Sequence, residues 1–187
     1  MKIAFRILQH TAVFTLFFLL SSIGASAQEK VAGNKGSRKA NMSFSVKKGE
    51  EIGVKIKAGR KEARLKKFTF RLDTDYRKQA RFKVNVYDLQ GAFPGKNIAT
   101  DSITSVIPRT GEPEENGVVV VVDLTPYKLS VKGDFLISIE WLETLPGNGP
   151  LFSSGLLNGG TWLKNGTGEW KKLPVIGASF QVGLERQ

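Results

Sequence analysis

Hydrophobic and polar residues alternate with a period of two through most of this chain. Successive side chains of a β-strand point to opposite faces, so each alternating run predicts a strand with one buried face. The clearest runs are residues 42–46, 52–58, 68–72, 82–86, 135–141 and 180–184. Weaker runs are residues 97–100, 102–107, 151–157 and 169–173. No stretch keeps a helical period beyond two turns, which favours an all-β fold.

One apolar run, residues 118–122, consists of five consecutive valines and does not alternate. A continuous apolar strand is typical of the interior of a sheet that is covered on both faces, so we expect a central strand here. The total of roughly eight to ten strands predicts a jelly-roll-like antiparallel β-sandwich over residues 41–187.

The N-terminal residues have the pattern of a secretory signal peptide. Lys2 and Arg6 precede an apolar run at residues 12–20, and the triplet Ala25-Ser26-Ala27 follows it. The run is about half of the roughly 20 residues that a membrane-spanning helix needs. We predict that residues 1–27 are removed and that the mature chain is periplasmic or extracellular, with no transmembrane segment. Residues 28–40 lack an apolar period and predict a flexible basic arm.

The composition excludes several kinds of chemistry. Among the 187 residues there is no cysteine and one histidine, His10, which lies in the predicted signal peptide. Disulfides, iron–sulfur clusters, cysteine nucleophiles, Ser-His-Asp catalysis and histidine-ligated metals are therefore excluded for the mature chain. We expect neither a metal nor another cofactor.

Charge is distributed unevenly along the mature chain. Residues 28–83 contain 18 basic and 6 acidic residues, whereas residues 84–187 contain 8 basic and 11 acidic residues. This asymmetry suggests an anionic surface polymer as partner. The candidate contacts lie on the polar sides of predicted strands and are Lys55, Lys57, Lys67 and Arg71. The alternative is a solvated face. Nucleic acid is a poor fit, because no aromatic residue is interleaved with these charges.

A glycine-rich segment, residues 147–168, provides candidate ligands for a sugar. It has seven glycines in 22 residues, and tryptophan rings and asparagine amides suit the stacking and hydrogen bonding of a carbohydrate. The candidate binding residues are Trp162, Trp170, Asn158 and Asn165. Trp162 is bracketed by glycines and is expected to be exposed, whereas Trp141 follows an alternating run and is expected in the core. The alternative is that the glycines form turns and the tryptophans pack on the core.

Two acidic clusters are candidates for other chemistry. Asp73 and Asp75 could act as an acidic pair or bind calcium, and a second cluster lies at residues 112–115. Turn formation is the favoured interpretation of the aspartates, because Asp is a common turn residue.

The segment from Thr161 to Leu184 resembles the C-terminal β-sandwich of secreted bacterial proteins described as carboxypeptidase-regulatory-like. The resemblance rests on residues 161–174 with a closing strand at 180–182, and upstream on residues 82–88, 94–97, 122–124 and 133–141. It implies export and a jelly-roll-like fold, and it carries no active site. Such proteins often carry a separate N-terminal module, which we do not expect here because the chain has no room for one.

These observations favour an exported, non-enzymatic β-sandwich that binds a glycan or an anionic surface polymer. Two alternatives stay open: a hydrolase of envelope polysaccharide that uses an acidic pair, and a structural or adhesive subunit. Retention on a glycan panel distinguishes binding from the release of products that hydrolysis would give.

Overall fold

A computed structural model describes residues 29–35, 43–72, 79–107, 117–144 and 150–186. The predicted signal peptide, residues 1–27, lies outside these ranges. The described residues form fifteen strands and one 3-10 turn, η1 (Thr125–Tyr127), and they contain no α-helix. The all-β prediction is confirmed, with more and shorter strands than the expected eight to ten.

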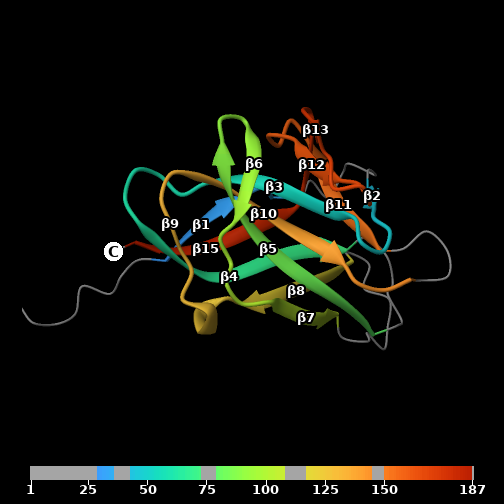
Figure 1. The fold of residues 1–187 in the computed structure, drawn as a ribbon, viewed down its shortest axis with the longest axis horizontal. Helices are drawn as coiled ribbons and strands as arrows, with labels where there is room; N and C mark the ends of the chain where they lie inside the picture. The colour runs from blue at the N-terminus through green and yellow to red at the C-terminus, as the bar shows by residue number, and fades with distance from the viewer. Residues whose placement is uncertain (1–28, 36–42, 73–78, 108–116, 145–149, 187) are drawn as a thin grey trace, which may run out of the picture.

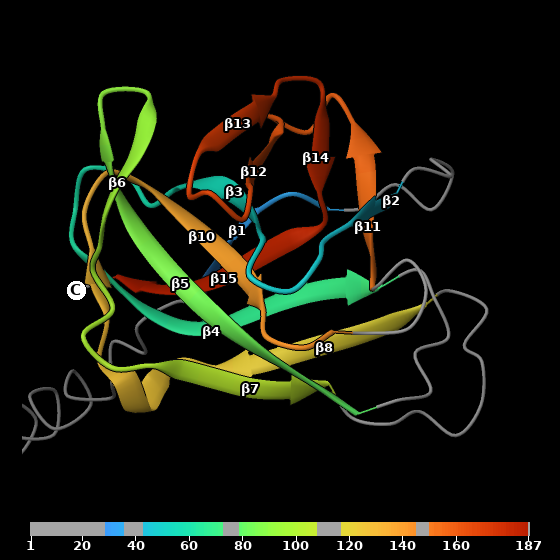
Figure 2. The same ribbon diagram turned by 45° about the vertical axis from the view of Figure 1, so that its right-hand side comes forward.

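The strands form two antiparallel sheets that pack face to face (Figures 1 and 2). Five strands of the eight-stranded sheet follow one another in the order β1 (Glu29–Gly33), β15 (Phe180–Arg186), β4 (Ala63–Leu72), β11 (Leu151–Leu156) and β14 (Ile176–Ala178). In addition, β2 (Ser43–Ser45) pairs with β11, and both β8 (Val118–Asp123) and β9 (Ser130–Val131) pair with β4. Six strands of the seven-stranded sheet follow one another in the order β13 (Trp170–Leu173), β12 (Thr161–Lys164), β3 (Glu51–Lys57), β10 (Asp134–Trp141), β5 (Ala80–Gln90) and β6 (Phe93–Asn97). The seventh strand, β7 (Ile103–Ile107), also pairs with β5.

Aromatic rings fill the core between the sheets. Phe70 of β4 lies at the centre, and its ring contacts Phe82 on the opposite sheet edge-to-face at 5.3 Å between centroids. It also lies 5.6–5.9 Å from the rings of Phe68, Phe152 and Phe180. Phe68, Phe70, Phe82 and Phe180 lie on the sides of their strands that the alternating pattern predicted to be buried. Trp141 belongs to the same core and is 1% exposed, as its strand predicted.

Two expectations about individual segments are wrong. Residues 29–33 were expected in a flexible arm but form β1, which pairs antiparallel with β15 from Glu29↔Glu185 to Gly33↔Gln181. The valine run was expected in the middle of a sheet, but β8 pairs with β4 at one edge. Its alternate residues Val119 and Val121 are exposed, because no second layer covers that face of the strand within the described residues.

In the part of the chain that the structure describes, no helix is long and apolar enough to cross a membrane.

Candidate functional site

The outer face of the seven-stranded sheet carries a second, smaller cluster of buried side chains. Ile52, Val54 and Ile56 of β3 point into the main core, so Glu51 and Lys55 point outward. The register places Glu51 beside Glu140 of β10 on one side and beside Lys164 of β12 on the other. We call this outward surface, with the hairpins β5–β6 and β12–β13 that adjoin it, the outer face.

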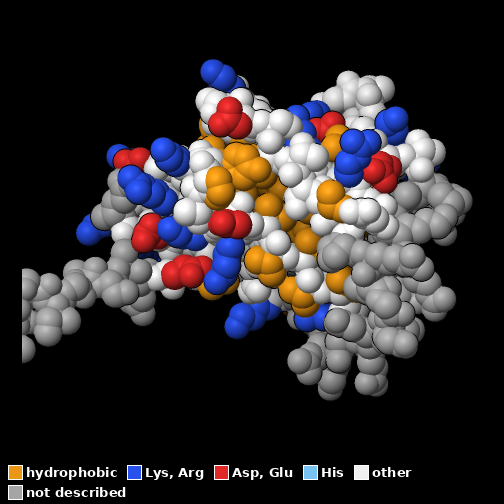
Figure 3. Space-filling model, turned by 90° about the horizontal axis from the view of Figure 1, so that it is seen from below, with side chains coloured by type: hydrophobic (Ala, Val, Ile, Leu, Met, Phe, Trp, Pro, Cys, Tyr) orange, Lys and Arg blue, Asp and Glu red, His pale blue; other side chains and the backbone are white. Residues whose placement is uncertain are grey.

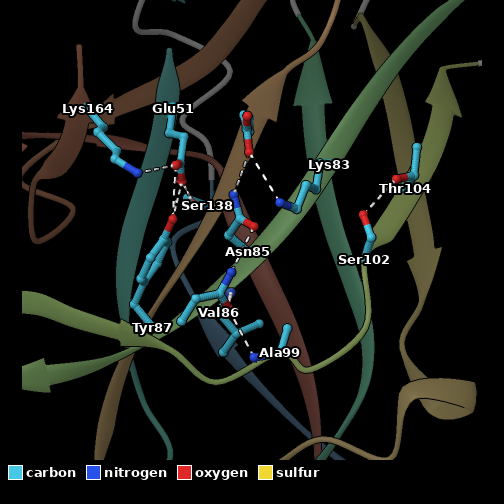
Figure 4. A network of polar contacts seen from close by, with 12 residues as sticks. Glu51, Lys83, Asn85, Val86, Tyr87, Ala99, Ser102, Thr104, Ser138 and Lys164 are labelled. Atoms are coloured by element: carbon cyan, nitrogen blue, oxygen red, sulfur yellow. Dashed lines mark hydrogen bonds and ion pairs between the residues drawn. The ribbon is translucent and has the colours of Figure 1, made fainter. Parts of the chain in front are cut away.

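Glu51 is the centre of a polar network on the outer face (Figure 4). Its side chain is only 3% exposed, yet both carboxylate oxygens accept hydrogen bonds. The Tyr87 hydroxyl donates to Oε1 at 2.9 Å and Ser138 Oγ donates to Oε2 at 2.6 Å. Lys164 Nζ forms an ion pair with Oε1 at 2.8 Å. A buried charge is tolerated only when it is paired and hydrogen-bonded, and Glu51 meets both conditions.

A second polar group adjoins this network. Asn85, which is 1% exposed, donates from Nδ2 to Glu140 Oε2 at 3.1 Å and accepts from Asn97 Nδ2 at 3.0 Å. Lys83 Nζ lies 3.7 Å from the same Glu140 oxygen. These contacts tie β10, β5 and β6 together, and they fix the base of the β5–β6 hairpin.

Aromatic side chains surround the polar network. Tyr87 meets Trp170 edge-to-face at 5.4 Å between centroids, and Lys164 Nζ lies 5.6 Å from the centre of each of these rings. Phe93 of β6 meets Trp162 edge-to-face at 5.5 Å, which joins the two hairpins. Phe93 is 61% exposed and Trp170 is partly exposed. The outer face therefore offers aromatic surface to solvent beside charged and amide groups.

Burial in this cluster and the nearby charge of Glu51 raise the pKa of Tyr87 well above its ordinary value. The hydroxyl therefore keeps its proton, and remains a donor to Glu51, to a higher pH than an ordinary tyrosine does. In the unfolded chain a tyrosine loses its proton near pH 10.0.

We predict that Tyr87 makes the fold sensitive to alkali. Above about pH 10 the unfolded chain binds fewer protons than the folded one, so the free energy of unfolding falls as pH rises. Urea titrations between pH 8 and pH 11 measure this slope. The Tyr87→Phe variant, which has no proton to lose, is expected to show a shallower decline. Equal slopes for the two proteins would contradict the prediction.

The structure corrects the expectation for the tryptophans. Trp162 was expected in an exposed loop, but it lies in β12 and is 3% exposed, packed with Tyr87 and Leu136. Trp170 lies opposite Lys164 in β13, on the same face. The glycines around Trp162 form the ends of a hairpin, and Gly160 has a φ of +87°, which favours glycine.

The two candidate asparagines take part in local structure. Asn165 Oδ1 accepts hydrogen bonds from Thr167 N at 3.1 Å and Glu169 N at 2.9 Å, and so shapes the β12–β13 turn. Asn158 Nδ2 donates to the carbonyl of Lys35 at 2.8 Å. Both side-chain amides thus form hydrogen bonds within the chain itself.

The four candidate cations do not form one surface. Lys55 and Lys57 lie on β3 of the seven-stranded sheet, whereas Lys67 and Arg71 lie on β4 of the eight-stranded sheet. All four point away from the core, so the two pairs lie on opposite outer surfaces of the sandwich. Lys55 is paired with Asp134 at 3.0 Å, and Lys67 with Glu29 at 2.8 Å. The four residues that the sequence offered as contacts for an anionic polymer therefore cannot act together as one binding surface.

Sequence reasoning missed the residues at the centre of the outer face, which are Glu51, Tyr87, Phe93, Ser138 and Lys164. One signal was present: the alternation of residues 82–86 continues through Tyr87, which puts an aromatic ring on the polar side of that strand. No comparable signal marks Glu51, because its burial depends on residues from three other strands.

The acidic candidates Asp73, Asp75 and residues 112–115 lie outside the described residues. Among those that the structure describes, no group of three or more histidine, cysteine, aspartate or glutamate side chains could hold a metal ion.

The sequence matches no protein-family model and no curated protein. Among solved structures, the chain is similar to a surface-layer-associated protein of Clostridium difficile, Cwp84, whose structure comprises cysteine protease and lectin-like domains. The TM-score is 0.53 at 10% identity, over 74% of this chain and 33% of the clostridial one. The present chain thus spans about a third of that protein, and the likeness shows the fold alone. A likeness to infectious bursal disease virus, with 11% identity over 86% of this chain and 30% of the viral one, has a TM-score of 0.26 and supports no argument.

Proposed function

We propose that this protein is an exported, non-enzymatic β-sandwich that binds a glycan through the outer face of its seven-stranded sheet. The observation that carries the proposal is the pair of solvent-accessible rings, Phe93 and Trp170, held by two hairpins above a rigid polar network. The predicted signal peptide supports export to the periplasm or beyond.

The outer face combines the two kinds of group that sugar recognition uses. The apolar face of a sugar ring stacks on an aromatic side chain, and its hydroxyls exchange hydrogen bonds with amides, carboxylates and ammonium groups. Here Phe93 and Trp170 supply accessible rings, Lys164 lies at the Trp170 ring, and Glu140 adds a second partly exposed charged side chain on the same face. The underlying ion pairs hold these groups in place, which lowers the entropy lost on binding.

The charges of this face favour a glycan over a polyanion. Four of its cations already form ion pairs with carboxylates, Lys55–Asp134, Arg81–Glu143, Lys83–Glu140 and Lys164–Glu51. An anionic polymer would have to compete with these partners for each of the four cations. A ligand that binds by stacking and hydrogen bonding does not meet this cost.

The hydrolase alternative is less well supported by the residues on this face. Glu51 and Glu140 are neighbours in the register, as an acidic pair would need. Both oxygens of Glu51, however, are occupied by Tyr87, Ser138 and Lys164, and the side chain is buried. A general acid or nucleophile must reach the substrate, so the contacts of Glu51 favour a structural role.

The likeness to the clostridial protein agrees with this proposal at the level of fold. That protein is described as containing a lectin-like domain, and lectins bind sugars. Its cysteine protease activity cannot be shared, because the present chain has no cysteine.

We predict that Phe93 is an anchor for the ligand. On an array of neutral and acidic polysaccharides, with heparin as a polyanion, Phe93→Ala is expected to weaken retention about tenfold, the range of one lost stacking contact. The melting temperature should stay nearly unchanged, because the ring is largely exposed. Leu157→Ala is the matched control, since Leu157 is an exposed apolar residue in the connection from β11 to β12, outside the two hairpins of the outer face.

Two results would refute the proposal. The first is that the unmodified protein binds no polysaccharide on the array. The second is that Phe93→Ala and Leu157→Ala bind as tightly as the unmodified protein. Retention on heparin alone, lost at moderate salt, would instead point to the anionic-polymer alternative, because salt screens the attraction between exposed charges over distances of about 8 Å and more.

A further inference from the structure

Strand β8 forms an apolar edge of the eight-stranded sheet. Val119 is 46% exposed and Val121 is 59% exposed, and within the described residues the strand pairs with β4 alone. Figure 3 views the molecule from the side on which β7 and β8 lie in Figure 1, and hydrophobic side chains form a band across the middle of that view. On β7, the neighbouring edge of the other sheet, Val106 is 37% exposed.

This edge lacks the usual protection against pairing with another strand. Natural edge strands are commonly interrupted by lysine, proline or a β-bulge, because their free N–H and C=O groups can accept a further strand. Residues 118–122 are all valine, and the pairing with β4 runs without a bulge from Leu72↔Val118 to Lys67↔Asp123. The strand is therefore regular, apolar and suited to pairing.

We propose that two copies of this chain associate through antiparallel pairing of their β8 strands, centred on Val120. In this arrangement Val119 of one copy lies opposite Val121 of the second copy. The two eight-stranded sheets then continue into one another, and the exposed valines of both copies form one apolar cluster.

The register follows from side-chain direction and charge. Residues directly opposite one another in an antiparallel pair point to the same face, so exposed valines must oppose exposed valines. Centring on Val120 places valine opposite valine at all five positions and Asp123 opposite Gly117 of the second copy. A shift to a centre at Val121 would place the Asp123 carboxylate opposite the side chain of Val119. The centre at Val120 is thus the register that pairs all five valines with one another and keeps the charge outside the apolar cluster.

A second copy is the occupant because the strand is its own complement. The sequence of residues 118–122 is the same in both directions, so a two-fold axis through Val120 matches it to itself. Its one charged residue does not meet its own copy across that axis, so self-pairing places no like charges opposite one another.

Sedimentation equilibrium of the full purified chain tests the association. We expect a concentration-dependent dimer, and we expect Val121→Lys to weaken dimerisation by about tenfold or more, because an ammonium group would be buried among valines. Val175→Lys is the matched control, since Val175 is exposed to a similar degree outside the strands and should leave the dimer intact. Circular dichroism of both variants checks that the fold is retained.

Cysteine cross-linking tests the register, and the absence of native cysteine makes it unambiguous. A mixture of Val119→Cys and Val121→Cys chains should form a disulfide-linked heterodimer, because these two positions oppose each other across the pair. Each variant alone should cross-link far less. The proposal is overturned if the unmodified chain is monomeric at every concentration, if Val121→Lys dimerises normally, or if the single variants cross-link as well as the mixture.

Discussion

Replacing Trp162 by alanine is expected to lower the free energy of unfolding by about 3 kcal/mol, the lower end for a buried tryptophan. The ring is 3% exposed, so its removal leaves a cavity between Tyr87, Leu136 and Phe93. The cost is at the lower end because Phe93, itself exposed, can move into part of the space. Urea denaturation of the two proteins measures the difference.

Two further tryptophan variants serve as controls for this result. Trp141→Ala removes a ring from the main core and should cost about 5 kcal/mol, the upper end of the same range. Trp170→Ala, on the partly exposed side of the cluster, should cost about 1–2 kcal/mol, because less of its surface leaves water on folding. If Trp162→Ala were as mild as Trp170→Ala, the ring would not be a packed element of the outer face.

Replacing Glu51 by alanine is expected to lower the free energy of unfolding by about 3 kcal/mol or more. This is the usual cost of removing one partner of a buried ion pair. The change leaves the Tyr87 hydroxyl and Ser138 Oγ without their acceptor and Lys164 without its counter-charge. Equilibrium urea unfolding at pH 7 gives the free energy. A loss below 1 kcal/mol would mean that water replaces the carboxylate without difficulty.

A double-mutant cycle separates the ion pair from the rest of this loss. Lys164→Met should recover part of the stability of the Glu51→Ala chain, because it removes the cation that was left unpaired. Asp134→Ala is the matched control on the same face: its ion pair with Lys55 has side chains about two-fifths exposed, and its loss should cost about 0–1 kcal/mol. Similar costs for Glu51→Ala and Asp134→Ala would show that burial does not strengthen the Glu51 pair.

Alternation with a period of two was sufficient to determine the all-β class and most of the core. The pattern is local, because a strand's successive side chains must point to opposite faces whatever its neighbours are. Residues such as Val54, Phe70 and Ile137 were therefore assigned to the buried side correctly. The same reasoning predicted that Trp141 belongs to the core.

The order of strands within each sheet was decided only by the tertiary structure. The valine run was expected at the centre of a sheet, since five apolar residues have no polar side to place in water. In the folded chain β8 lies at an edge, where Val119 and Val121 meet solvent. Composition shows how apolar a strand is, but not which other strands lie beside it or cover it.

The outer face was likewise beyond the reach of local pattern. Glu51, Tyr87, Ser138 and Lys164 come from β3, β5, β10 and β12, and they are up to 113 residues apart in sequence. At the level of sequence each one is a polar position on a half-buried strand. The register of four strands brings them together. The β12–β13 hairpin then contributes Lys164, which pairs with Glu51, and Trp170, whose ring contacts Tyr87. The sequence by itself determined which face of each strand is polar; long-range strand pairing decided which of those polar faces becomes a buried network, because burial depends on what the neighbouring strands place above it.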